Sequence, residues 1–160
     1  MSNKYKPLTA PITRREACTI VDRRRFDGAV RTGILVTLGK DGEGVTSPLV
    51  FDQPSVREFA KRIAAELLTE SRALRASAKE VEKMKPPLTR RQVARLLGKR
   101  LTGILIRSGE LAPDGKLTDT QTAAHTYNPI DVAALIRALA DEKEADSKLL
   151  ARAAKTRVPA

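Results

Sequence analysis

The sequence is poor in the residues that build metal sites, disulfides and aromatic cores. Its 160 residues include one cysteine (Cys18), one histidine (His125) and no tryptophan, and aromatic residues make up 3%. These two side chains cannot supply a zinc site or an internal disulfide. No apolar run approaches the length of about 18 residues that a membrane-spanning helix needs, and the N-terminus lacks the apolar segment of a secretory signal. We therefore expect a cytoplasmic protein with a core of Leu, Ile, Val and Ala and with no cofactor.

Positive charge is what the chain has in excess. Thirty Lys and Arg residues against 19 Asp and Glu residues give a formal net charge of +11 and an isoelectric point near 10.2. A charge of this size favours a polyanionic partner, with nucleic acid as the first candidate. Charge alone leaves DNA, ribosomal RNA and acidic proteins open.

The sequence also repeats itself. Residues 11–64 align with residues 87–140 without a gap, and 13 of the 54 aligned pairs are identical. We call this constant shift, which places Thr13 on Thr89, the repeat offset. A chance likeness between two arginine-rich helices would not extend to positions outside the helices, so we interpret the chain as a tandem repeat. The aligned pairs outside any expected helix are Gly33/Gly109, Leu35/Leu111 and Phe51/Tyr127.

Each repeat predicts a short helix, a tight break, a second helix, a two-stranded hairpin and a third helix. A capping box opens the first helix, because Thr is followed three residues later by Glu or Gln (Thr13 and Glu16, Thr89 and Gln92). The remaining boundaries are breaks at Asp22 and Gly98 as helix C-caps, second helices over 24–32 and 100–108, stops at Gly33 and Gly109, hairpins between Leu35 and Phe51 and between Leu111 and Tyr127, and third helices N-capped near Ser55 and Asp131.

The two repeats resemble the MerR/excisionase type of winged helix-turn-helix. That pattern runs Thr-x-x-Glu-Ala-Ala-x-Leu-Leu-Gly, a recognition helix, Gly-x-Leu, a wing, an aromatic residue and Asp-Val. The segments that carry the resemblance are ITRREACTIVDRRRFDGAVRTGIL with LVFDQPSVREF, and LTRRQVARLLGKRLTGILIRSGEL with TYNPIDVAAL, about 108 of the 160 residues. The copies depart from the pattern at Asp22, at Ser55 and in the apolar stretch 101–106. The resemblance implies a mainly α fold with small β wings, as two tandem winged helix-turn-helix units that are each followed by a long helix.

Two long helices are expected around these units. Residues 56–84 contain no Gly or Pro and keep apolar residues three or four apart, with an interruption near Glu70–Ser71. The last helix starts near Asp131 and extends toward Arg157. In relatives of this type such a helix often dimerises, so a homodimer through the long helices is one expectation and a solvated connector is the other. The predicted domains are a basic N-terminal arm (1–10), unit 1 (11–64), a helical linker (65–86), unit 2 (87–140) and a C-terminal helix and tail (141–160).

The basic residues concentrate on the helix-turn-helix segments. Residues 13–31 carry six Arg and three acids, and residues 89–107 carry five Arg, one Lys and no acid. Arginines at helix N-termini oppose the helix dipole, which makes sense where DNA phosphates share the site, and the second helix enters the major groove in this architecture. The predicted DNA-binding residues are Arg14, Arg15, Arg23, Arg24, Arg25, Arg31, Lys40, Arg90, Arg91, Lys99, Arg100, Thr102, Arg107 and Lys116.

We expect the first turn of the second helix in each repeat to recognise the DNA sequence. Arginine grips guanine through O6 and N7 together, so Arg23, Arg24, Arg25 and Arg100 are expected to contact base edges. Asp27 lies one turn beyond Arg23 and is expected to orient it. Solvated helix faces are the alternative for any single arginine.

No catalytic constellation stands out, and we expect no enzyme. Cys18 aligns with Ala94, which favours a small buried residue over a nucleophile. His125 lies in the second wing, and the stretch Gly39–Gly44 lacks the Gly-Lys-Ser/Thr end of a phosphate-binding loop and does not open a helix.

Three functions remain. The first is a sequence-specific double-stranded DNA-binding protein of a mobile element, phage or plasmid, located at the nucleoid, as a recombination directionality factor, transcriptional regulator or architectural protein. The second is an adaptor that retains the fold and uses residues 87–140 to hold a recombinase or polymerase, with Leu101, Ile104, Leu105 and Ile106 as its apolar surface. The third is an RNA-associated protein, which the scarcity of aromatic residues for base stacking disfavours.

Overall fold

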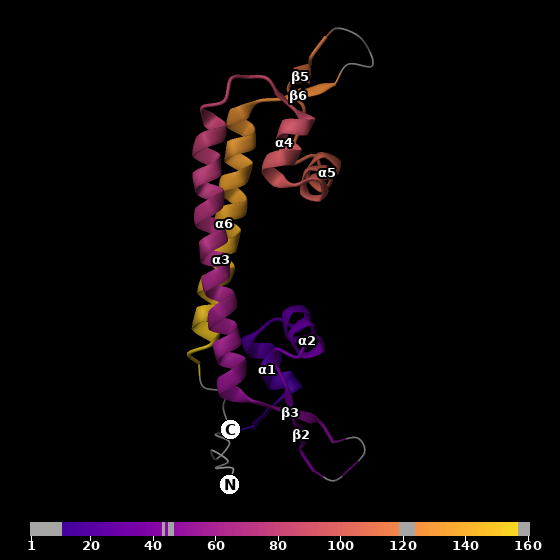
Figure 1. Cartoon of the computed structure of the whole chain (residues 1–160), viewed down its shortest axis with the longest axis vertical. Coiled ribbons are helices and arrows are strands. Elements are labelled where there is room, and N and C mark those ends of the chain that lie inside the picture. The colour runs from indigo at the N-terminus through magenta and orange to yellow at the C-terminus, as the bar shows by residue number, and fades with distance from the viewer. Residues whose placement is uncertain (1–10, 43, 45–46, 119–123, 157–160) are drawn as a thin grey trace, which may run out of the picture. The chain divides into compact units, whose positions relative to one another are not determined.

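The computed structural model describes residues 11–42, 44, 47–118 and 124–156 (Figure 1). Within them the chain is mainly helical, with small antiparallel sheets. It divides into two compact units: unit 1 comprises the chain up to Leu67 and the segment from Ala145, and unit 2 comprises Leu68–Glu144. The predicted N-terminal arm (1–10) lies outside the described residues. In the described part of the chain, no helix combines the length and apolarity needed to cross a membrane.

Unit 1 contains a three-stranded antiparallel sheet and two short helices. Its elements are β1 (Pro11–Thr13), α1 (Arg14–Ile20), α2 (Arg23–Arg31), β2 (Thr37–Lys40), β3 (Leu49–Asp52), the first part of α3 (Gln53–Glu82) and the last part of α6 (Pro129–Ala153). Strand β3 lies between β1 and β2 in the sheet. Ile12 pairs with Phe51 on one side of β3, and Lys40 pairs with Leu49 on the other.

Unit 2 contains the same elements in the same order. They are β4 (Leu88–Thr89), α4 (Arg90–Leu97), α5 (Lys99–Ser108), β5 (Gly115–Lys116), β6 (His125–Tyr127), the later part of α3 and most of α6. Leu88 pairs with Tyr127, and Lys116 pairs with His125. Each of these pairs is related to its counterpart in unit 1 by the repeat offset. The offset found in the sequence is therefore also an offset in strand register.

Strands β1 and β4 were not predicted from the sequence. They are only three and two residues long, too short to show the alternation that identifies a strand. Each ends at the threonine that caps the following helix. The predicted capping boxes are confirmed at both sites, where the Thr13 and Thr89 hydroxyls accept from the backbone N–H groups of Glu16 and Gln92.

Two predicted helix caps of unit 1 are wrong. Asp22 does not end α1; its Oδ1 accepts a hydrogen bond of 3.1 Å from the Arg25 N–H and so caps the start of α2. Helix α3 is capped by Asp52 rather than Ser55, because the Asp52 carboxylate accepts from the Ser55 N–H at 3.0 Å. A short acidic side chain just before a helix reaches the unpaired N–H groups of the first turn, which explains both positions.

The corresponding caps in unit 2 use different residues at the aligned positions. Gly98 connects α4 to α5 with a φ of +84°, a backbone conformation that favours glycine. Asn128, and not Asp131, precedes α6 as its cap: its Oδ1 accepts from the Ile130 N–H at 2.9 Å. Asp52 and Asn128 are themselves aligned by the repeat offset.

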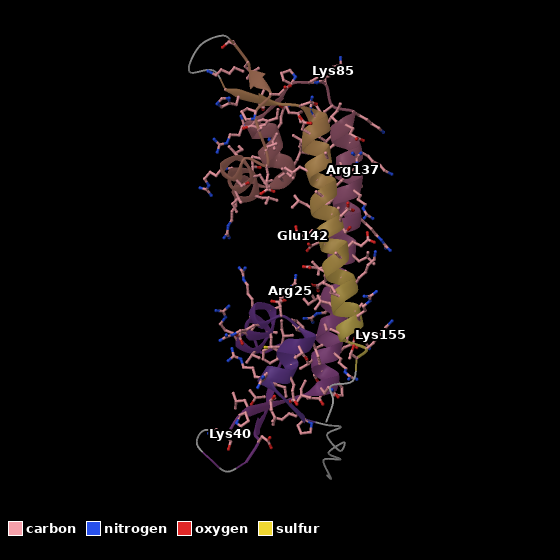
Figure 2. The ribbon with its side chains drawn as sticks, turned by 180° about the vertical axis from the view of Figure 1, so that it is seen from behind. Arg25, Lys40, Lys85, Arg137, Glu142 and Lys155 are labelled. Atoms are coloured by element: carbon pink, nitrogen blue, oxygen red, sulfur yellow. The ribbon has the colours of Figure 1, made fainter. Side chains whose placement is uncertain are left out.

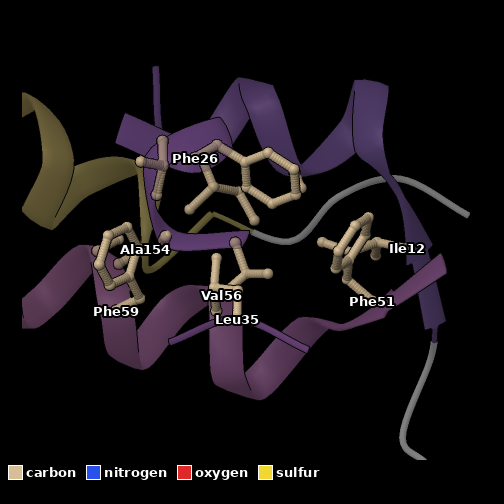
Figure 3. Packing of buried hydrophobic residues seen from close by; sticks show 12 residues of the cluster. Ile12, Phe26, Leu35, Phe51, Val56, Phe59 and Ala154 are labelled. Carbon is tan, nitrogen blue, oxygen red and sulfur yellow. The ribbon is translucent and has the colours of Figure 1, made fainter. Parts of the chain in front are cut away.

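The core of unit 1 surrounds a pair of phenylalanines (Figure 3). The rings of Phe26 and Phe51 meet edge to face, with centroids 4.9 Å apart and planes at 80°, a favoured arrangement for aromatic pairs. Ile12, Leu35 and Val56 pack in the same cluster. Ala154, just beyond the end of α6, is also buried there.

The core of unit 2 forms separately around Tyr127, Leu88 and Leu105. Ala78 and Val81 of α3 belong to this cluster and are fully buried. Ala78 is the counterpart of Ala154 under the repeat offset. Each core thus receives an alanine from the end of the other repeat's long helix or from just beyond it. The stretches 65–86 and 141–160, which the sequence predicts as a linker and a tail, therefore also provide packing surface. The predicted domain boundaries themselves stay a prediction.

A buried serine marks the pairing of the long helices within each unit. In unit 2, Ser71 is fully buried and donates to the Ala140 carbonyl at 2.8 Å. In unit 1, Ser147 donates to the Ala64 carbonyl at 2.7 Å. The repeat offset relates Ser71 to Ser147 and Ala64 to Ala140, so the two bonds are equivalent. The polar residue that interrupts the apolar pattern near Ser71 therefore makes a hydrogen bond between the helices.

Candidate nucleic-acid interface

In unit 1, the predicted DNA-binding residues lie mainly at the starts of two helices. Arg14 and Arg15 occupy the first turn of α1, and the run 23–25 occupies the first turn of α2. Figure 2 labels Arg25 on α2 and Lys40 at the end of β2. Arg31 is the last residue of α2, where its charge agrees with the helix dipole.

The main partner of Asp27 is Arg14 and not Arg23, which Asp27 was expected to orient. Arg14 Nη2 donates to both Asp27 carboxylate oxygens at 2.7 Å, and Arg14 Nε donates to Oδ1 at 3.1 Å. These hydrogen bonds, followed by the charge of Asp27, raise the pKa of the Arg14 guanidinium above its ordinary value. Arg23 lies 3.7 Å from Asp27, close enough for an ion pair but not for a hydrogen bond. The expected role of Asp27 toward Arg23 is thus secondary.

Arg25 is also engaged with acidic side chains. Its guanidinium lies 3.1 Å from Asp22 and 3.5 Å from Asp146 of α6. Its side chain is 33% exposed, less than that of Arg23 at 78%. Arg25 is one of the four arginines expected to contact bases, and its guanidinium is already paired with two carboxylates of unit 1.

In unit 2, the equivalent helix starts are basic and carry no acid. Arg90 and Arg91 are exposed on the first turn of α4, and Lys99 and Arg100 are exposed on the first turn of α5. None of these four forms an ion pair with a carboxylate of the described residues. Arg107 near the end of α5 and Lys116 in β5 are exposed as well.

A groove of about 730 Å³ opens among these residues. The first turns of α4 and α5 and the β5–β6 hairpin contribute to it. Cations form much of its wall, so it suits an anion. Its lining residues are Thr89, Arg90, Arg91, Ala94, Arg95, Lys99, Thr102 and Ala124.

Two assignments change here. Thr102 does not belong to the exposed set, because it is only 1% exposed and its hydroxyl donates to the Gly98 carbonyl at 2.9 Å. It lies at the base of the groove as part of the fold. Arg95 was not predicted, although it is exposed and lines the groove. Its spacing of four residues from Arg91 places both on one face of α4 and was the available signal.

Cys18 and His125 are the side chains that the sequence offered as catalytic candidates. Cys18 packs partly buried against the core of unit 1, and this burial raises the pKa of its thiol, which disfavours the reactive thiolate. His125 lies exposed in β6. Among the described residues, no cluster of three or more His, Cys, Asp or Glu side chains could hold a metal ion.

The apolar surface expected on unit 2 is largely core. Leu105 is buried, and Leu101 and Ile106 pack against the same cluster, which leaves Ile104 as the exposed member of the four. Unit 1 instead exposes four large apolar side chains in the segment before β2 and in β2 and β3. They are Ile34, Val36, Leu38 and Leu49.

Comparison with known proteins adds no identification. No protein-family model, curated protein or solved structure matches the chain. The resemblance to the MerR/excisionase type therefore stays a prediction.

Proposed function

We propose that the chain is a sequence-specific double-stranded DNA-binding protein built from two winged helix-turn-helix modules of the MerR/excisionase type. The observation that carries this proposal is the cationic groove of unit 2, which no acidic side chain of the described residues lines. A surface of this kind matches the phosphate backbone, which supplies most of the affinity in protein–DNA binding. A mobile element, phage or plasmid regulator is the role we assign to it.

The order of elements supports the same function. In each unit two short helices meet at a tight break, and a hairpin and a long helix follow. In helix-turn-helix proteins the second helix lies in the major groove with its first turn at the bases, while the first helix contacts the backbone. By this geometry α2 and α5 are the recognition helices, with Arg23, Arg24 and Arg100 as the base-contacting candidates. Arg14, Arg15, Arg90 and Arg91 then contact phosphates.

A salt titration tests the proposal. The full chain is titrated onto a labelled duplex at a series of salt concentrations, with single-stranded RNA of equal length as the control. Two engaged units neutralise roughly 6–10 phosphates, which gives a log–log slope on the order of −5 to −9. A slope near −2 on duplex DNA, or equal affinity for the RNA, contradicts the proposal. A selection of preferred sites from random duplexes then tests sequence specificity.

A protein-interaction adaptor is the second candidate. The observation that favours it is the exposed apolar group of unit 1, since unit 2 has Glu110, Ala112, Asp114 and His125 at the aligned positions. Exposed apolar patches of this kind mark interaction surfaces more often than scattered single residues do. An adaptor that holds a recombinase or polymerase would keep its partner when Arg90 and Arg91 are replaced by alanine, whereas duplex binding would weaken by roughly tenfold.

A further inference from the structure

We propose that unit 2 carries the principal phosphate-binding surface of the protein, and that in unit 1 carboxylates mask two arginines, Asp27 masking Arg14 and Asp22 with Asp146 masking Arg25. This inference rests on the proposed DNA-binding function. It adds to that function that unit 2, rather than unit 1, makes most of the contacts to the phosphodiester backbone.

The first argument compares Arg14 with Arg90. The two arginines are aligned by the repeat offset and occupy the same position in the first turn of their helices. Asp27 grips Arg14 through both of its carboxylate oxygens, which is the geometry in which a guanidinium also binds a phosphate. The residue that aligns with Asp27 is Gly103, so no carboxylate stands at this place beside Arg90. A DNA phosphate must displace Asp27 in unit 1 but meets an open guanidinium in unit 2.

The second argument concerns the start of the recognition helices. In unit 1, Asp22 and Asp146 both lie within ion-pair distance of Arg25. In unit 2, Gly98 replaces Asp22 and Leu101 replaces Arg25. Unit 1 thus places three carboxylates within its basic surface, and each of them repels an approaching phosphate as well as occupying an arginine.

The third argument is the groove. In unit 2 the cations Arg90, Arg91, Arg95 and Lys99 converge on one concavity, and no acidic side chain of the described residues lines it. A concavity of unit 1 lies at a different place, at the start of α2, and is lined by Asp22, Arg24, Arg25 and Asp146, two acids and two bases. The concave surface at the short helices is therefore cationic in unit 2, whereas the one at the start of α2 in unit 1 pairs its bases with acids.

A reciprocal exchange in the full chain tests this assignment. Asp27→Ala frees Arg14 and keeps a strong helix former in α2. Gly103→Asp places a carboxylate beside Arg90, and an added Cβ at Gly103 meets no atom within 4 Å. Exposed ion pairs of good geometry are weak individually, so Asp27→Ala should lower the duplex dissociation constant about two- to fivefold. Gly103→Asp should raise it by roughly fivefold or more, because it both occupies Arg90 and repels phosphate.

Three controls separate masking from simple charge or folding effects. Glu58→Gln changes the net charge equally in unit 1, but Glu58 pairs with Lys61 on α3 and not with a predicted DNA contact. Gly103→Ala adds the Cβ without the charge. The double variant Arg14→Ala, Asp27→Ala removes the residue through which the gain should act. Thermal unfolding of every variant checks that the fold is retained.

The expected pattern is a gain for Asp27→Ala that is mostly lost in the double variant, with little change for Glu58→Gln and Gly103→Ala. The salt slope should steepen by about one unit for Asp27→Ala and flatten by about one for Gly103→Asp. Equal gains for Asp27→Ala and Glu58→Gln, or an unchanged affinity for Asp27→Ala, overturn masking while leaving the proposed function in place. Absence of duplex binding by the wild type overturns both.

Discussion

Unit 1 and unit 2 place the same backbone hydrogen bonds at positions related by the repeat offset, yet they use the exposed faces of their short helices differently. In unit 1 acidic residues lie among the arginines, and the hairpin side exposes apolar side chains. In unit 2 the same helix faces are basic without acids, and the positions aligned with the exposed apolar side chains of unit 1 hold Glu110, Ala112, Asp114 and His125. The comparison teaches that a few positions maintain the fold. Examples are the capping threonines and the buried aromatic residue that each unit has at the aligned positions Phe51 and Tyr127. The exposed positions are free to diverge toward different tasks.

The largest effect is expected in the cores, where the units also differ. Phe26 and Thr102 occupy the same position, but Phe26 is a fully buried ring against Phe51. Phe26→Ala should lower the local stability of unit 1 by about 3–5 kcal/mol, because it leaves a cavity. Thr102→Ala should cost unit 2 about 1 kcal/mol through one lost hydrogen bond. Hydrogen exchange resolved by unit measures both, and equal costs would contradict the difference in core construction.

A second comparison exchanges the helix-start arginines for alanine. Arg90→Ala with Arg91→Ala should weaken duplex binding by roughly tenfold and flatten the salt slope by about two. Arg14→Ala with Arg15→Ala should weaken it by about threefold or less, because Asp27 already occupies Arg14.

Anisotropy titrations of the two double variants at the same salt concentration provide the measurement. Both variants carry the same change in net charge, so each is the control for the other. Equal losses would show that both units contact phosphate to the same extent.

The repeat explains how much the sequence could predict. The capping boxes, the two short helices of each unit and the buried Phe51 and Tyr127 follow from residues that recur at a fixed offset. The same offset aligns Thr102 with Phe26, and the structure buries both side chains, so Thr102 belongs to the core positions and not to the exposed DNA contacts. Helix caps were placed less well, because several nearby polar residues can reach the same N–H groups and only backbone geometry chooses among them.

Contacts between distant segments were outside the reach of the sequence. Asp146 follows Arg25 by more than a hundred residues, and nothing in its surroundings in the sequence indicates their pairing in unit 1. Likewise, Ala78 and Ala154 look like ordinary positions of amphipathic helices, and their burial against the core of the opposite repeat depends on how the long helices pair. Local patterns define elements, whereas the partner of each apolar or charged face is settled by tertiary packing.

A third prediction concerns a feature that the units share. Ser71→Ala and Ser147→Ala each remove one buried hydroxyl that donates to a helix carbonyl. Each should cost about 1 kcal/mol, because the carbonyl keeps its acceptor role within its own helix. Denaturant unfolding of the two variants should give similar losses. A much larger loss for one of them would show that the long-helix pairing is not equivalent in the two units.

The smallest effect, and the sharpest contrast, lies in the two capping boxes. Thr13 donates to Glu16 through its backbone N–H and its hydroxyl, while Thr89 donates to Gln92 in the same way. The hydrogen bonds from Thr13, with the backbone bond as the larger cause, lower the pKa of Glu16 below its ordinary value of 4.5. A carboxyl whose pKa is lower in the folded state stabilises the fold above its unfolded pKa, and this stabilisation is lost as the pH falls through the folded value.

Helix α1 should therefore lose protection from hydrogen exchange as the pH falls below about 4.5, whereas α4 should keep its protection because Gln92 does not titrate. The change should stay below about 1 kcal/mol, since the cap is largely exposed. Glu16→Gln, which copies the residue of unit 2, should abolish the pH dependence in α1, and Gln92→Glu should create it in α4. If α1 keeps a pH-dependent protection in Glu16→Gln, the dependence comes from another carboxyl of unit 1, and the capping box is not its origin.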